Sequence, residues 1–163
     1  MKQVIFLRHA KSSWEIAVED RHRPLQEKGI RAAAAVANHW LTFFLSADAL
    51  LSSPANRAFH TAAILAHAIE YPFEKFHVQE NLYTFSSQAI VRAVQQLDPR
   101  WDKVILVGHN PALSDAADYL SVKPTPELKT ADWISLTFVE NSWEAIARGE
   151  PEFGTKKEAL KQA

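Results

Sequence analysis

Two short stretches of this sequence place an arginine or a histidine within two residues of the end of an apolar run. Arg8 and His9 follow the run Val4–Leu7, and His109 comes just after the run Val104–Val107. A guanidinium matches the oxygens of a phosphoryl group with a rigid fork of N–H donors. An imidazole serves as nucleophile, general acid or hydrogen-bond donor. Brought together, these side chains indicate an anion site suited to phosphoryl transfer.

A third stretch places an arginine after the apolar run Ala49–Ser52. The letters SSPANR end in Arg57, and Pro54 within them is suited to the first turn of a helix, whose N–H groups favour anions. Ligands of open parallel sheets bind beyond the carboxyl ends of the strands, so the side chains after these runs are expected to meet at one edge. We therefore expect one site built from Arg8, His9, Arg57 and His109.

Short apolar runs alternate with longer alanine- and leucine-rich stretches along the chain, a pattern typical of an α/β fold. The runs predict strands over residues 4–7, 49–52, 76–78 and 103–107. The longer stretches predict helices over residues 26–45, 54–69, 86–97 and 110–120. Alternating apolar residues predict an antiparallel edge pair over residues 133–139 and 143–147. We therefore expect three αβα layers around a mostly parallel sheet with an antiparallel edge.

The chain length of 163 residues is that of one domain. We expect the domain to span residues 1–149. Residues 150–163 are charged and poor in large apolar side chains, so they are expected to form a C-terminal arm or a frayed tail.

Composition excludes several classes of protein. The formal net charge of −1 leaves no overall positive field that would attract nucleic acid. Cysteine is absent, which excludes disulfides, thiolate chemistry and cysteine-based zinc sites. No apolar run approaches the roughly 20 residues of a membrane span, and the N-terminal run is too short for a signal peptide. We expect a soluble, cytoplasmic protein with no membrane partner, and the oligomeric state is left open.

Three motifs resemble those of the histidine phosphatase superfamily: LRHAKSSW, SSPANRAFHTA and VGHNP. The overall pattern is most similar to the small SixA-like phosphohistidine phosphatase branch, and it covers roughly Lys2 to Leu120. Ala10 stands where the superfamily commonly has glycine, but the SixA-like branch resembles this chain in that position. The resemblance implies a phosphoglycerate mutase-like fold.

The resemblance also implies roles for the four residues, without a metal or another cofactor. His9 would attack phosphorus, Arg8 and Arg57 would clamp the phosphoryl oxygens, and His109 would donate to those oxygens. An attacking imidazole must be neutral, so an acceptor such as a backbone carbonyl should hold its other nitrogen. His109 is expected to be protonated instead, because a bound phosphate dianion raises its pKa.

Two carboxylates are candidates for the role of general acid. The resemblance implies that Glu80 stands at about the place where larger members of the superfamily carry a carboxylate that acts as general acid. Asp20 is the other candidate. A phosphohistidine needs little acid, because its imidazole leaves readily, so neither carboxylate is strictly required.

Other polar residues near the motifs are candidates for phosphate or substrate binding. Arg21 and Arg23 either extend the anion site toward a partner or form ion pairs with Glu19 and Asp20. The remaining candidates are Lys11, Ser12, Ser53 and Asn56.

Three functions are consistent with these residues. The first is a phosphatase acting on protein phosphohistidine, the second a small-molecule phosphomonoesterase, and the third a non-catalytic module that binds a phosphorylated ligand. The four residues together argue against a pure binding module, which needs no nucleophile. The short chain argues against the phosphomonoesterase, because few residues remain for a lid over a small substrate. The expected partner is a phosphohistidine-bearing protein or, in the second case, a small phosphorylated substrate.

Overall fold

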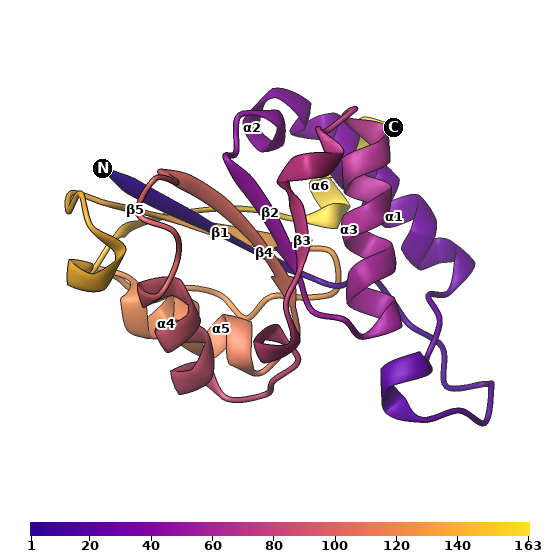
Figure 1. The fold of residues 1–163 in the computed structure, drawn as a ribbon. Helices are drawn as coiled ribbons and strands as arrows, with labels where there is room; N and C mark the ends of the chain where they lie inside the picture. The colour runs from indigo at the N-terminus through magenta and orange to yellow at the C-terminus, as the bar shows by residue number, and fades with distance from the viewer.

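The computed structural model describes residues 1–163, and its centre is one sheet in the strand order β3-β2-β4-β1-β5-β6 (Figure 1). The first four strands of that order run parallel, whereas β5 is antiparallel to β1 and β6 is antiparallel to β5. The strands are β1 (Lys2–Arg8), β2 (Ala49–Ser52), β3 (Phe76–Val78), β4 (Lys103–Gly108), β5 (Trp133–Phe138) and β6 (Glu150–Gly154).

Helices cover both faces of the sheet (Figure 1). One face carries α1 (Glu27–His39), α2 (Leu41–Leu45), α3 (Asn56–Ala68) and α6 (Lys156–Lys161). The other face carries α4 (Ser87–Gln95) and α5 (Ala112–Leu120). The predicted αβα layers, mostly parallel sheet and antiparallel edge are confirmed. Single turns of 3-10 helix lie at Asp20–His22, Phe73–Lys75, Glu80–Leu82 and Trp143–Ala145. None of the helices has the length and apolar character needed to cross a membrane.

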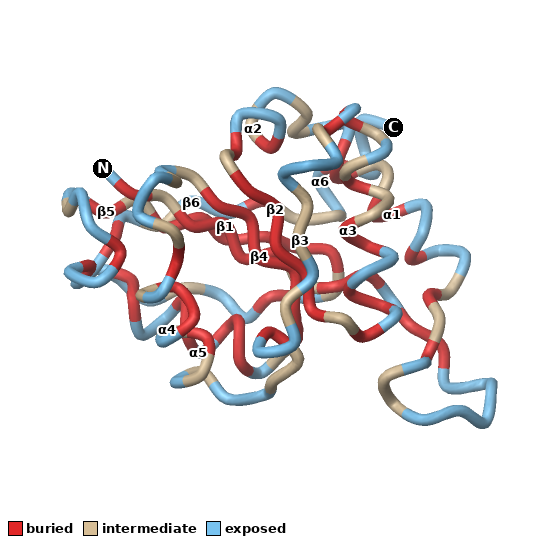
Figure 2. The backbone as a smooth tube through the Cα atoms, in the orientation of Figure 1, coloured by how far each residue is buried: buried red, intermediate tan, exposed pale blue.

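The central strands are buried on both faces (Figure 2). In β1, Val4 and Phe6 pack into the core under α4 and α5, while Ile5 and Leu7 pack into the core under α1 and α3. This is why the run has no polar alternation, and each buried side chain of this size contributes about 1.5–3 kcal/mol.

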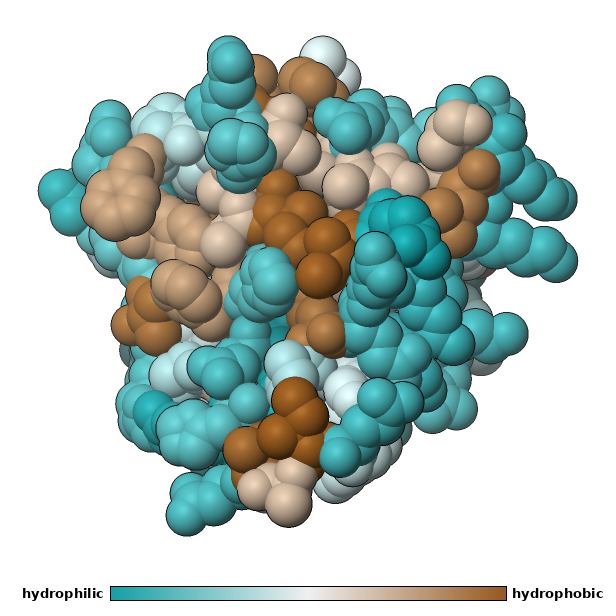
Figure 3. Space-filling model, turned by 90° about the vertical axis from the view of Figure 1, so that its right-hand side faces the viewer, coloured by the Kyte–Doolittle hydropathy of each residue, from teal (hydrophilic) through white to brown (hydrophobic).

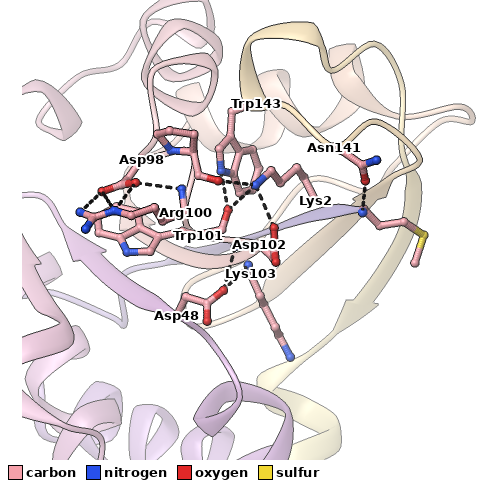
Figure 4. A network of polar contacts seen from close by, with 11 residues as sticks. Lys2, Asp48, Asp98, Arg100, Trp101, Asp102, Lys103, Asn141 and Trp143 are labelled. Atoms are coloured by element: carbon pink, nitrogen blue, oxygen red, sulfur yellow. Dashed lines mark hydrogen bonds and ion pairs between the residues drawn. The ribbon is translucent and has the colours of Figure 1, made fainter.

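A network of polar contacts holds the amino end of β1 against β4 (Figure 4). The Lys2 side chain is 2 % exposed, and its Nζ donates to the carbonyls of Pro99 and Trp101 and to the Asp102 carboxylate. Trp143 donates its Nε1 proton to the Trp101 carbonyl. Every ammonium proton therefore has an acceptor, which offsets the cost of burying the charge.

The C-terminal segment differs from its prediction. Glu150–Gly154 is the edge strand that pairs with β5, and α6 packs against α1, so residues 150–163 are not a frayed tail. The expected edge strand at 143–147 is wrong, because Trp143 turns inward and its side chain is buried in the core beside α4. An edge strand needs backbone hydrogen bonds to only one neighbour, so its sequence need not be apolar.

The single helix expected over residues 26–45 is also wrong. The chain leaves helical geometry at Trp40 (φ −111°, ψ 36°) and begins α2 at Leu41. The change of direction brings the Phe43 ring to 4.8 Å from the Trp133 ring and buries Phe44 completely. Packing around the Trp133 ring therefore overrides the helix propensity of this stretch.

Gly154 tests this packing. A Cβ added to it would lie 2.5 Å from Trp133 Nε1 and 2.6 Å from a ring carbon of Trp40. We expect Gly154→Ala to lower the free energy of unfolding by about 1–3 kcal/mol in urea denaturation, because the rings must shift. Gly108→Ala is the control, since its Cβ would meet Leu113 at an ordinary 3.6 Å. Equal stability of the two variants would contradict the close packing around Gly154.

Candidate active site

Three parallel strands end at the same edge of the sheet. Arg8, the last residue of β1, lies in register with Gly108, the last residue of β4, and Ser52 of β2 lies in register with Val107. His9 and His109 therefore leave the sheet side by side. Their ring centroids are 5.3 Å apart, with the ring planes at 54°.

The two histidines lie at an open depression of about 320 Å³ beyond this edge. All four residues expected to converge line it. The complete lining is Arg8, His9, Lys11, Ser12, Trp14, Asp20, Arg23, Arg57, Phe85, His109, Asn110 and Thr130. No group of three or more His, Cys, Asp or Glu side chains suited to a metal ion is present.

His9 is held with one nitrogen free. Its Nδ1 lies 2.7 Å from the Ala10 carbonyl oxygen, which can only accept, so Nδ1 carries the proton and Nε2 keeps its lone pair. Burial, together with Arg57, Arg8 and Arg23, lowers the pKa of His9 from 6.5 to about 4. At neutral pH, His9 is therefore an uncharged imidazole able to attack through Nε2.

His109, unlike His9, has a side-chain hydroxyl as its hydrogen-bond partner. Its Nε2 lies 2.8 Å from the Ser53 hydroxyl oxygen, and its Nδ1 is buried without a partner. Burial, His9 and Arg57 lower the pKa of His109 to about 3. In the free protein His109 is therefore neutral, whereas the expected protonation concerns the state with a phosphate dianion bound. Ser53 bonds to this histidine, whereas the sequence suggested contact with phosphate.

Arg57 is 2 % exposed and is held by the loop between β1 and α1. It donates to the Asp20 carbonyl at 2.7 Å and to the Asp20 carboxylate at 2.9 Å. Burial raises the pKa of Asp20, but hydrogen bonds from Tyr83, Arg57 and Arg23 outweigh it and lower the pKa to about 2. In the free protein, Asp20 is therefore a carboxylate that orients Arg57 and has no proton to donate.

Arg8 is held from the other side of the site. Its Nη1 donates to the Leu128 carbonyl at 2.9 Å, and Asn110 donates to the same carbonyl at 2.8 Å. The Nε of Arg8 and the Nε of Arg57 are buried without a partner, like Nδ1 of His109. Three side chains that line one depression thus each keep a buried polar nitrogen without a partner, although buried polar groups are normally hydrogen-bonded.

The structure does not bring every candidate to the depression. Glu80 accepts two hydrogen bonds from Arg21, at 2.6 and 2.9 Å, and neither residue lines the depression. The Arg21 hydrogen bonds lower the pKa of Glu80, so this carboxyl is ionised. Asn56 donates to the His22 carbonyl and ties the start of α3 to the loop.

Lys11 and Ser12 were candidates for phosphate binding, and both line the depression. Arg23 lines it too, and it also forms the alternative ion pair with Asp20, at 3.2 Å. Sequence reasoning missed Trp14, although this residue stands within one of the three motifs, because an exposed tryptophan has no spacing signal. It also missed Phe85, whose ring lies 5.7 Å from that of His109. Phe85 lies in the loop between the turn at Glu80–Leu82 and α4, and the path of this loop was not predicted.

The sequence matches the family model of the histidine phosphatase superfamily (branch 1) over residues 4–85. This chain belongs to the histidine phosphatase superfamily. The match spans β1, β2, α3 and β3, and so includes Arg8 at the end of β1, His9 directly after it and Arg57 in α3. The family proposed from the motifs is thereby confirmed.

Individual proteins are similar to this chain in sequence or in fold. An uncharacterized protein of Mycobacterium tuberculosis is 34% identical over 134 residues, which cover 81% of this chain and 80% of the relative. The structure of the protein histidine phosphatase SixA complexed with tungstate has a TM-score of 0.76 at 22% identity, covering 93% of this chain and 94% of SixA. A mycobacterial glucosyl-3-phosphoglycerate phosphatase has a TM-score of 0.69 at 15% identity, covering 95% and 98%. The fold is that of SixA-like and related phosphatases.

The protonation state of His9 can be measured directly. In an NMR titration of histidine-labelled protein, we expect its ring to stay neutral from pH 7 down to about pH 5 and to titrate near 4, because burial and the arginines disfavour the cation. Arg57→Met should raise the midpoint, whereas Arg57→Lys, which keeps the charge, should raise it less. A wild-type midpoint near the ordinary 6.5 would contradict the geometry.

Proposed function

We propose that this member of the histidine phosphatase superfamily hydrolyses phosphohistidine on a protein, through a covalent phosphohistidine intermediate at His9. One observation carries the proposal. A neutral imidazole with a free Nε2 stands beside Arg8, Arg57 and His109, each of which keeps a buried polar nitrogen without a partner. A nucleophile surrounded by unused donors is what the transfer of a phosphoryl group requires.

In the first step, His9 Nε2 attacks phosphorus and the phosphorus–nitrogen bond of the substrate breaks. A substrate imidazole that carries a proton on its distal nitrogen then leaves as a neutral imidazole. His9 becomes a phosphorylated imidazolium, whose Nδ1 proton stays on the hydrogen bond to the Ala10 carbonyl. Arg8, Arg57 and His109 offer donors to the three phosphoryl oxygens.

In the second step, water attacks phosphorus and the bond to Nε2 breaks. His9 leaves as a neutral imidazole, and both water protons end on the dihydrogen phosphate that is released. The two steps are matched, because each expels a neutral imidazole and neither needs an outside acid.

The state of the carboxylates supports a phosphoramidate substrate. Tyr83, Arg57 and Arg23 keep Asp20 ionised, and Arg21 keeps Glu80 ionised. Neither therefore holds a proton that an alcohol leaving group would need. An imidazole that already carries a proton on its distal nitrogen needs none from the enzyme, so the ionised site favours phosphohistidine over stable phosphoesters.

The rim of the depression supports a protein substrate. The loop between β1 and α1 projects from the body, and the side chains of Trp14, Ile16 and Val18 are 75 %, 56 % and 43 % exposed (Figure 1). Figure 3 shows a small apolar patch at the lower end of the face that carries this loop. Trp14 also lines the depression, so a protein whose phosphorylated side chain enters it would meet this apolar loop.

A substrate comparison tests the proposal. We expect the protein to hydrolyse a phosphohistidine protein and phosphoramidate faster than a panel of sugar phosphates, with activity retained in a chelator. His9→Ala should abolish turnover, because no intermediate forms, while His67→Ala on the exposed face of α3 should not change it. Preference for sugar phosphates would favour a small-molecule phosphomonoesterase. Binding without turnover would favour the non-catalytic module.

The apolar loop makes a separate prediction. Ile16 and Val18 do not line the depression, so the double variant Ile16→Ser, Val18→Ser should leave the hydrolysis of phosphoramidate unchanged. Its KM for a phosphohistidine protein should rise about tenfold, since truncating an apolar contact of this kind costs about 1–2 kcal/mol. Phe73→Ser and Val139→Ser remove exposed apolar side chains elsewhere and serve as controls. An unchanged KM in the double variant would show that the substrate does not contact the loop.

A further inference from the structure

We propose that Ser53 is a positioning residue that holds His109 in the tautomer with its proton on Nδ1. In this tautomer, a neutral imidazole presents an N–H donor to the phosphoryl group. The inference rests on the proposed function, because it concerns the donor role of His109. It goes further by assigning to Ser53 a role exerted through His109 and not through contact with substrate.

The sheet itself places Ser53 beside His109. Ser53 follows β2 and is fully buried, and its backbone N–H donates to the Val107 carbonyl of β4 at 3.0 Å. This bond continues the β2–β4 ladder by one residue, to the point where His109 leaves β4. The Ser53 hydroxyl oxygen then lies 2.8 Å from His109 Nε2.

The hydrogen-bond partners decide the direction of this contact. The Ala55 N–H donates to the Ser53 hydroxyl oxygen at 3.3 Å, and His109 Nε2 is the one acceptor that this hydroxyl contacts. If Nε2 carried the ring proton, the buried serine proton would have no acceptor, which is unfavourable. The Ser53 hydroxyl therefore donates to Nε2, and the ring proton lies on Nδ1.

The surroundings explain why the tautomer matters. The groups that face His109 are His9 after β1, Arg57 of α3, Asp20 and Arg23 of the β1–α1 loop, and Tyr83 and Phe85 before α4. The two arginines and burial oppose a second proton on His109, although Asp20 favours one. A neutral His109 can donate to phosphate only if its single proton is on the nitrogen that Ser53 leaves free. That nitrogen is the buried Nδ1, which has no protein partner.

The tautomer can be read without an activity assay. In the ligand-free wild-type protein, ¹⁵N NMR of labelled histidine should show a protonated Nδ1 and an unprotonated Nε2 for His109 at pH 7. Ser53→Ala should shift the signals toward a mixture with the Nε2–H form, and Ser53→Thr should restore the wild-type pattern. A wild-type His109 protonated on Nε2 would overturn the proposal, whatever the variants do.

Kinetics of the Ser53 variants test whether the tautomer of His109 affects turnover. We expect Ser53→Ala to lower kcat for phosphoramidate by about 10- to 100-fold with a smaller change in KM. This is less than the roughly 100- to 1,000-fold typical of deleting a donor outright, because part of the protein keeps the useful tautomer. Ser53→Thr should retain most of the activity.

Ser52→Ala is the matched control. Ser52 is equally buried, but its hydroxyl donates to the Ser53 carbonyl and not to His109, so kcat should be unchanged. A loss of activity in Ser52→Ala equal to that in Ser53→Ala would indicate a merely structural role for this corner and would overturn the proposal. If the wild type hydrolyses no phosphoramidate or phosphohistidine at all, the proposed function fails, while the tautomer measurement still decides the hydrogen bond.

Discussion

The parallel, in-register pairing of β1 with β4 is the constraint on which the site depends. Because Arg8 pairs with Gly108, the next residues His9 and His109 leave the sheet together, and the His9 N–H donates to the Gly108 carbonyl at 3.1 Å. The buried Lys2 network secures the same pairing at the opposite end (Figure 4). A shift of one residue would turn every side chain of β1 to the other face and separate the histidines.

Burial of cationic side chains at this edge sets the chemistry. Arg57 is tolerated in the interior because Asp20 accepts from it twice, and the half-buried Arg8 donates to the Leu128 carbonyl. The same burial keeps His9 and His109 neutral, since a further positive charge among the arginines is unfavourable. The protein has a net charge of only −1, so its attraction for an anion is local, built from donors left without partners.

The C-terminal segment contributes more than its composition suggested. Lys156, the first residue of α6, donates to the backbone and side chain of Thr130, which lines the depression. Its backbone N–H also binds the buried Asp132 carboxylate, whose other oxygen accepts from the Lys129 N–H. This segment thus supports the wall of the site next to the carbonyl of Leu128 that holds Arg8. An edge strand of this kind is stabilised by backbone bonds, so apolar periodicity did not reveal it.

The sequence by itself determined five strands of the sheet, β1 to β5, and the four residues at its edge. Continuous apolar runs mark strands buried on both faces, and parallel strands bring the residues after their carboxyl ends to one edge. Tertiary structure alone decided which hydrogen-bond and ion-pair partners the side chains in and around the site have. The contacts of Asp20 with Arg57, of Glu80 with Arg21 and of Ser53 with His109 join residues 37, 59 and 56 positions apart. Such contacts depend on loop paths and on which nitrogen finds an acceptor, and neither has a local pattern in the chain.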